Sequence, residues 1–400
     1  GLLTTVPLRP SREKRRVWAV GGETRWDDGA YGAAPVGDGW HRASLRRAPE
    51  VYESGPRTRT GDVRPAWTLP LTGGVMSQLK ADDDSVYVSQ MDGAVLRVRA
   101  SDGKPLWRRT TGGGYAHSSP LVWDDLVVVG TADGRVHALD RENGRVRWTF
   151  RTEGPVYGSA VALSESLVIP SGDGRLYWLD RKTGKERGRQ TMPPSETAFV
   201  QSPLATDGAL VFAGAWDKRT YAFDGNTGEI VWSREGTKGK SFAYSPAIGN
   251  PVHADGKVVV PANGNSLWCY RASDGEPLWE TVSPRDKFGY SSPRIADGRV
   301  YVGCLGDLGE GRCVDLGTGE IVWAAATGST IYDAGPALTS RWAVFASVSG
   351  LLSAADRRTG EIGWRVRLAP GHLLSTPVAI GDRLFAASYA NELVAFDLPR

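Results

Sequence analysis

The fold is decided by residues 126–148, which read LVVVGTADGRVHALDRENGRVRW. Two runs of mostly apolar residues are separated by Asp133-Gly134, and a third run follows Asn143-Gly144. Dipeptides of this kind supply the positive backbone φ angles that two-residue hairpins require. With the apolar residues just upstream, at 121–122, the stretch predicts four short antiparallel strands joined by tight turns.

The pattern recurs along the chain, with a tryptophan four residues after a turn glycine. The pairs are Gly103/Trp107, Gly144/Trp148, Gly228/Trp232, Gly275/Trp279, Gly319/Trp323 and Gly360/Trp364. Trp67 and Gly188, which stands where another tryptophan is expected, bring the number of positions to eight, spaced 40 to 47 residues apart. A period in this range, with β-rich units, is typical of propeller blades. We therefore expect an all-β, eight-bladed β-propeller with four-stranded antiparallel blades.

The two ends of the propeller are expected to share one blade. After Trp364 the chain holds only three strand-like runs, whereas residues 65–69 carry Trp67 without a preceding blade. An N-terminal strand that completes the last blade would close the ring and remove open sheet edges. We assign residues 63–400 to the propeller and residues 1–62 to an N-terminal extension, with the remnant of a preceding domain as one interpretation.

The tryptophans are interpreted as structural, because a ring of that size fills the wedge between diverging sheets. Burying each one removes on the order of 200 Å² from water, worth several kcal/mol at about 25 cal/mol per Å². Gly188 is therefore expected to leave a weaker contact at its wedge.

Composition excludes several partners. The formal net charge is +3, and the surplus lies in residues 1–60, so that the remaining 340 residues carry a net charge of −1. Neutralising many phosphates needs clustered cations, so we expect no nucleic acid as a partner. No stretch approaches 18 consecutive apolar residues, and we expect no membrane span.

Cysteines and acidic runs give weaker signals. Cys304 and Cys313 flank a predicted hairpin loop and are expected either to form a disulfide, as in an exported protein, or to be two half-buried thiols. On this basis we expect an exported or extracellular location, with a cytoplasmic one as the alternative. Asp82-Asp83-Asp84 lacks an EF-type loop, so we predict a solvated cap rather than a metal site.

The repeat resembles that of pyrroloquinoline-quinone-type propellers, whose tryptophan-docking pattern is Ala-x-Asp-x-x-x-Gly-x-x-x-Trp. The residues that fit it include Ala138, Asp140, Gly144 and Trp148, and likewise Ala222, Asp224, Gly228 and Trp232. The resemblance covers residues 64–400. It implies one of three roles: a quinone-dependent dehydrogenase, an outer-membrane assembly lipoprotein of the BamB kind, or a propeller fused to an enzyme such as a metallophosphoesterase. The chain lacks the adjacent Cys-Cys pair of many alcohol-oxidising members, which counts against a redox role.

A binding site is sought at positions that differ from blade to blade, since positions shared by all blades serve the fold. One such series stands at the start of each innermost strand and is predicted to face the central channel or its mouth: Ser77, His117, Gly158, Gln201, Tyr244, Tyr290, Asp333 and Ser375. Loops of the same face add Trp216, Asn263 and Tyr389. We predict a polar, aromatic-lined ligand site there, with a water-filled funnel as the alternative. His117 and Asp333 lie in blades too far apart for a hydrogen bond across a typical channel.

These observations favour a non-catalytic binding or scaffold propeller. It is expected to recognise a protein partner or a small molecule at the channel face, without a cofactor. The alternatives are a dehydrogenase that uses pyrroloquinoline quinone with calcium, an accessory propeller of a larger enzyme, and a propeller lyase or cyclase.

Overall fold

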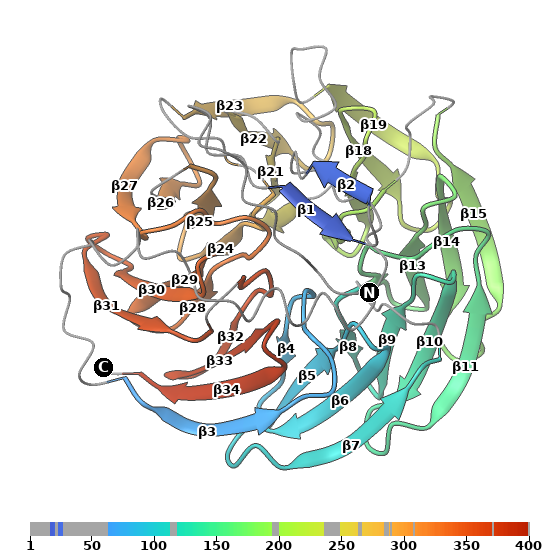
Figure 1. Ribbon diagram of the computed structural model, residues 1–400. Coiled ribbons are helices and arrows are strands. Elements are labelled where there is room, and N and C mark those ends of the chain that lie inside the picture. Colours follow the sequence, from blue (N-terminus) through green and yellow to red (C-terminus); the bar gives the residue numbers. More distant parts are fainter. Residues whose placement is uncertain are drawn as a thin grey trace.

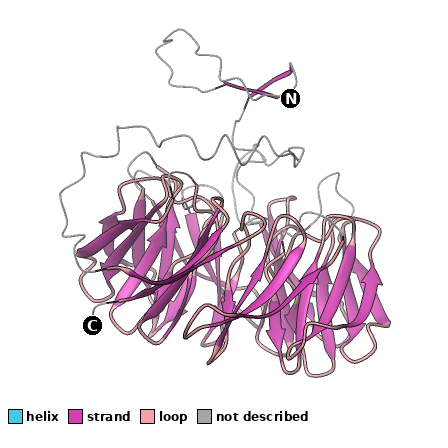
Figure 2. Cartoon of the chain, turned by 60° about the horizontal axis from the view of Figure 1, so that its bottom comes forward, coloured by secondary structure: helices cyan, strands magenta, loops and turns pink. Residues whose placement is uncertain are grey.

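The structure is a computed structural model that describes residues 17–20, 23–26, 63–112, 118–193, 200–235, 249–262, 266–283, 288, 290–306, 309–369 and 372–398. Within these ranges the regular elements are β-strands, and no helix is long and apolar enough to cross a membrane. Eight four-stranded antiparallel sheets stand around a central axis (Figure 1), which confirms the predicted eight-bladed propeller. Figure 2 shows the sheets from the side, with their connecting loops gathered at two opposite faces.

In blades 1 to 7 the four strands follow one another in chain order, with the first strand next to the axis and the fourth at the outer edge. Blade 1 holds β4 (Lys80–Ala81), β5 (Ser85–Ser89), β6 (Ala94–Arg99) and β7 (Pro105–Thr110), and blade 2 holds β8 (Leu121–Trp123), β9 (Leu126–Gly130), β10 (Arg135–Asp140) and β11 (Val146–Arg151). Blade 3 holds β12 (Val161–Ala162), β13 (Ser166–Pro170), β14 (Arg175–Asp180) and β15 (Glu186–Thr191), and blade 4 holds β16 (Ala205–Thr206), β17 (Leu210–Gly214), β18 (Arg219–Asp224) and β19 (Ile230–Glu235).

Blades 5 to 7 repeat this order. Blade 5 holds β20 (Val252–Ala254), β21 (Lys257–Pro261), β22 (Ser266–Arg271) and β23 (Pro277–Val282), and blade 6 holds β24 (Arg294–Ala296), β25 (Arg299–Cys304), β26 (Glu310–Asp315) and β27 (Ile321–Ala326). Blade 7 holds β28 (Ala337–Leu338), β29 (Trp342–Ala346), β30 (Leu351–Asp356) and β31 (Ile362–Arg367).

Blade 8 closes the ring as predicted. It combines β32 (Val378–Ile380), β33 (Arg383–Ser388) and β34 (Glu392–Asp397) with β3 (Pro65–Pro70) from the N-terminal part of the chain. Trp67 of β3 pairs with Ala395 of β34, and the blue and red strands lie side by side in Figure 1. Upstream of the propeller, β1 (Val17–Val20) and β2 (Glu23–Trp26) pair as a two-stranded sheet.

The core lies between the blades rather than within them. Each of the eight clusters of buried apolar side chains combines residues from two neighbouring sheets. The outer-strand tryptophan of one blade packs on the turn glycine of the next: a Cβ at Gly144, where φ is +68°, would lie 2.7 Å from the Trp107 ring. The indole N–H of Trp107 donates to the carbonyl of Arg141 at 2.8 Å. The tryptophans are therefore structural, as predicted.

The wedge beside blade 3, where Gly188 was expected to leave a weaker contact, is filled by a tryptophan from another strand. Trp178 of β14 pairs across the strands with Gly188 of β15, and its indole N–H donates to the carbonyl of Gly225 at 2.8 Å. In blade 2 the equivalent pair is Ala138 with Trp148. Blade 3 has thus exchanged the large and the small residue between adjacent strands, and the tryptophan still fills the wedge.

The alternative of a disulfide between Cys304 and Cys313 is wrong. Cys304 pairs with Glu310, whereas Cys313 pairs with Tyr301, which lies three residues before Cys304 on β25. Because side chains alternate between the two faces of a strand, the two thiols point to opposite sides of the sheet. Cys304 accordingly lies in the core between blades 5 and 6 and Cys313 in the core between blades 6 and 7. All three cysteines of the chain are free and buried.

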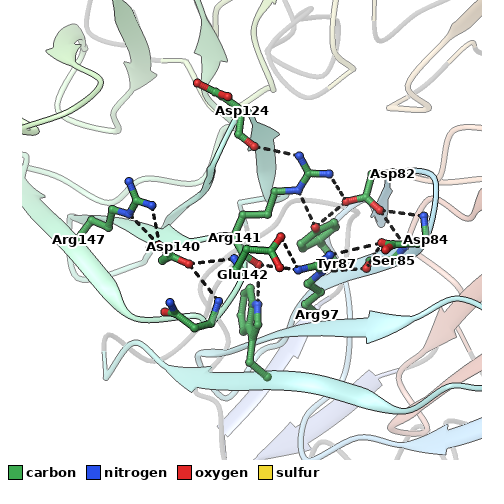
Figure 3. A network of polar contacts seen from close by, with 12 residues as sticks. Asp82, Asp84, Ser85, Tyr87, Arg97, Asp124, Asp140, Arg141, Glu142 and Arg147 are labelled. Atoms are coloured by element: carbon green, nitrogen blue, oxygen red, sulfur yellow. Dashed lines mark hydrogen bonds and ion pairs between the residues drawn. The ribbon is translucent and has the colours of Figure 1, made fainter.

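Asp82 is not the solvated cap that the acidic run predicted. Its carboxylate accepts hydrogen bonds from Tyr87 and Arg141, both at 2.6 Å (Figure 3). Arg141 belongs to blade 2 and also donates to the carbonyl of Asp124 at 2.9 Å, so the cluster ties blades 1 and 2 together. Burial favours the neutral acid, but the hydrogen bonds from Tyr87 and Arg141 outweigh it and lower the pKa of Asp82 to about 2.

Candidate binding site in the central channel

Small residues line the point where the eight inner segments approach the axis. They stand three positions before each inner strand: Ser77, Ser118, Gly158, Ser202, Gly249, Ser291, Ala334 and Ser375. A Cβ at Gly158 would lie 2.4 Å from the carbonyl oxygen of Ser202, so only glycine fits there. Ser89 and Ser291 donate side-chain hydrogen bonds to carbonyls of the next blade. The predicted site residues Ser77, Gly158 and Ser375 belong to this packed ring.

The other predicted residues of the mouth fall into three groups around one face. Gln201 accepts a hydrogen bond from the indole of Trp216 at 3.1 Å in blade 4. The ring of Tyr290 lies 5.0 Å from that of Tyr332, between blades 6 and 7, with Asp333 next in sequence. Tyr389 of blade 8 covers Gly74 of blade 1. The three predicted residues His117, Tyr244 and Asn263 lie outside the described part of the chain.

Below this mouth a glutamine closes the channel. Gln78 of blade 1 donates from its side-chain amide to Asn250 Oδ1 at 3.2 Å and to Ser292 Oγ at 3.0 Å. Asn250 belongs to blade 5, opposite blade 1 in a ring of eight, and all three side chains are buried. A direct hydrogen bond between Gln78 and Asn250 therefore spans this channel.

Beyond Gln78 lies a cavity of about 370 Å³ inside the ring of inner strands. The first residue of each inner strand is aliphatic in six blades, but it is Lys80 in blade 1 and Arg294 in blade 6. Both cationic side chains line the cavity, together with Leu121, Val161 and Ala205. This pair was not predicted from the sequence, although a lysine and an arginine at an otherwise aliphatic position are a visible signal.

The two cations converge on one oxygen. Lys80 Nζ and Arg294 Nη2 each lie 3.4 Å from Gln78 Oε1. Burial, followed by the charge of Arg294, lowers the pKa of Lys80 to about 7, and burial lowers the pKa of Arg294. The cavity is therefore a site of positive potential with a partly aliphatic wall.

The described lining does not fit a calcium-bound quinone. Ca²⁺ takes six to eight oxygen ligands, with carboxylates commonly among them. None of the described residues around the cavity is Asp or Glu, and Lys80 and Arg294 would repel a divalent cation.

The fold and the tryptophan-docked sheets define a propeller of the pyrroloquinoline-quinone-like class. The family model described as outer membrane protein assembly factor BamB matches residues 13–241, 221–307 and 309–399, and the chain belongs to this family. The protein of that name from Burkholderia pseudomallei is 24% identical over 383 residues, which cover 94% of this chain and 86% of that protein.

Two solved structures share the fold. The crystal structure of BamB from Moraxella catarrhalis has a TM-score of 0.70 at 18% identity and covers 84% of this chain and 98% of that one. A europium-containing methanol dehydrogenase has a TM-score of 0.72 at 13% identity and covers 84% of this chain and 93% of that one. At these identities the likeness concerns architecture alone, which BamB and the dehydrogenase share.

Proposed function

We propose that this chain is an exported, non-catalytic scaffold that assists the assembly of outer-membrane proteins by holding a protein partner at the mouth of its channel. Membership of the BamB family over nearly the whole chain supports a role in the assembly of outer-membrane proteins. The structural observation that carries the proposal is the set of aromatic side chains around the mouth, in blades 4, 6, 7 and 8, above a channel that Gln78 closes.

A partner as wide as a protein suits this arrangement better than a small molecule. Trp216, Tyr332 and Tyr389 come from three different parts of the ring, and each is only partly buried. Tryptophan and tyrosine supply a large apolar surface together with a hydrogen-bonding group, and they are enriched in the energetic centres of protein interfaces. A small ligand would contact one of these groups, whereas a protein segment can bridge them.

Complementation tests the proposal. The chain, expressed with an export signal in a bacterium that lacks its own BamB, is expected to restore the level of folded outer-membrane porins. The triple variant Trp216→Ala, Tyr332→Ala, Tyr389→Ala should lose this rescue while it still accumulates and unfolds cooperatively. Val231→Ser, on the exposed outer strand of blade 4, is the control and should rescue fully. Failure of the wild-type chain, or full rescue by the triple variant, would overturn the proposal.

The dehydrogenase alternative is tested by a separate assay. Pyrroloquinoline quinone and calcium are added to the purified chain, and dye-linked oxidation of alcohols and aldehydes is followed. We expect the rate to equal that of the blank. Reproducible turnover would replace the scaffold by a quinone-dependent dehydrogenase.

A further inference from the structure

Among the described residues, two cationic side chains of the channel lack an acidic partner of the kind that the buried Arg97 and Arg312 have. Arg97 pairs with Asp84 and Glu142, and the fully buried Arg312 pairs with Glu310. By contrast, neither Lys80 nor Arg294 forms an ion pair with any residue that the structure describes. None of the described residues that line the cavity is Asp or Glu.

We propose that this cavity binds a small organic anion, with its carboxylate or phosphate group between Lys80 and Arg294 and its apolar body against the aliphatic wall. The inference is independent of the proposed scaffold role, because it concerns a different part of the channel from the aromatic mouth.

Electrostatics provides the first argument. Removing an unpaired charge from water is costly, and a nearby opposite charge offsets that cost. The lowered pKa values of Lys80 and Arg294 reflect burial without compensation. An anion between them would favour the charged form of both groups, so part of the cost of folding is recovered when the ligand binds.

Hydrogen-bond geometry provides the second argument. The amide nitrogen of Gln78 is committed to Asn250 and Ser292, which fixes its oxygen toward the two cations. This oxygen accepts one contact from each, at 3.4 Å, longer than a strong hydrogen bond. An ammonium group has three donors and a guanidinium group has five, so both retain donors for a ligand. Gln78 thus holds the two cations close to one point.

The size and the wall of the cavity define the ligand class. A volume of about 370 Å³ lies at the lower end of the range for small-molecule sites. Leu121, Val161, Ala205 and Val252 line the side contributed by blades 2 to 5, away from the cations of blades 1 and 6. An inorganic ion would leave this wall without contact. A monocyclic carboxylate or phosphate uses both halves of the cavity.

Calorimetric titration of the full chain tests the site with benzoate, phenyl phosphate and the neutral analogue benzamide. We expect at least one of the two anions to bind with a Kd on the order of 1 mM or tighter. Benzamide should bind at least about tenfold more weakly, because it lacks the charge. The preferred head group, carboxylate or phosphate, follows from the comparison of the two anions.

Variants locate the binding. Lys80→Met and Arg294→Met should each weaken it by about tenfold or more. Lys104→Met removes an exposed lysine and should leave it unchanged. Both channel variants remove a half-buried charge that has no ion pair among the described residues, and both are expected to fold, which a thermal unfolding curve checks. Proton uptake gives a second measurement: at pH 8, in two amine buffers of different ionisation enthalpy, binding to the wild-type chain should take up a fraction of a proton and binding to Lys80→Met less.

Three results would overturn the proposal. These are no binding of either anion at millimolar concentration, equal affinity for benzamide, and unchanged affinity in both folded channel variants.

Discussion

The indole of Trp178 donates its hydrogen bond to the carbonyl of Gly225 from a strand on which no other blade uses a docking tryptophan. The usual position, one strand further out, holds Gly188, around which a Cβ would meet nothing within 4 Å. The acceptor is the equivalent residue in every such contact: Gly225 stands three positions before turn glycine Gly228, as Arg141 does before Gly144. The wedge between blades 3 and 4 is therefore filled from a different strand.

Trp178→Ala should therefore destabilise the chain as much as removal of a regular docking tryptophan. Trp178 is 4% exposed, and its loss leaves a cavity between the sheets. We expect the free energy of unfolding, measured by chemical denaturation, to fall by about 3–5 kcal/mol. Trp148→Ala should lower it by a similar amount. An effect near zero for Trp178→Ala would show that the wedge does not depend on this ring.

The double variant Trp178→Ala, Gly188→Trp should recover part of that loss. In this variant an alanine on β14 faces a tryptophan on β15, as Ala138 faces Trp148 in blade 2. The comparison is a double-mutant cycle, in which a favourable coupling between the two positions is expected. Strictly additive effects would contradict the exchange of large and small residues.

A second test separates two costs at the turn glycines. Gly144 and Gly256 both have a φ of +68°, but a Cβ would meet the Trp107 ring at Gly144 and open space at Gly256. Gly256→Ala should lower the free energy of unfolding by about 1 kcal/mol, because alanine is strained at a positive φ even where its Cβ has open space. Gly144→Ala should cost at least about 1 kcal/mol more, because the ring must shift. Equal unfolding free energies for the two variants would remove the steric role of the docking glycine.

The repeat could be predicted from the sequence because its signals are local. The glycine of each turn and the tryptophan four residues later, as in Gly144 and Trp148, mark the blade, and the unpaired segment around Trp67 marks the closure. The exchange in blade 3 depends on cross-strand register, which spacing along the chain does not give. The contact between Gln78 and Asn250 joins residues 172 positions apart, and it depends on how closely opposite blades approach the axis.

Acid should weaken the contact between blades 1 and 2. The pKa of Asp82 is lowered to about 2 in the folded chain, below the ordinary value of 3.8. Its contribution to stability is therefore complete above about pH 4 and is lost as the pH falls through 2. Asp82→Asn should have a lower free energy of unfolding than the wild type at pH 7, as measured by denaturant titration. The difference between the two chains should become smaller toward pH 2. Asp83→Asn, at an exposed position of the same turn, is the control and should show no such narrowing.

The thiols should be unreactive in the folded chain. Cys269, Cys304 and Cys313 are all free and buried, and burial raises the pKa of Cys313 to about 11. Because the thiolate is the reactive form, a colorimetric thiol reagent at pH 8 should label none of them on the time scale of minutes. All three should react once the chain is unfolded, without a reductant. A requirement for reductant would indicate a disulfide.

Alkaline conditions should stabilise the chain through Lys80. Its folded pKa of about 7 lies below its ordinary value of 10.5, so between these values the unfolded chain holds a proton that the folded chain lacks. Stability from this group therefore rises with pH across that window. Lys80→Met should have a higher free energy of unfolding than the wild type at pH 6. This difference should become smaller toward pH 10.

The comparison isolates one group because the other titratable residues around the cavity, Arg294 and His253, are common to both chains. Denaturant titrations at pH 6, 8 and 10 measure the difference, and Lys104→Met is the matched control for loss of an exposed lysine. If the difference in unfolding free energy between Lys80→Met and the wild type stays constant over this range, Lys80 has its ordinary pKa in the folded chain and burial in the cavity does not lower it. Benzoate at pH 6 should narrow this difference, because it binds the folded wild type more tightly than the folded Lys80→Met variant and therefore stabilises the wild type more.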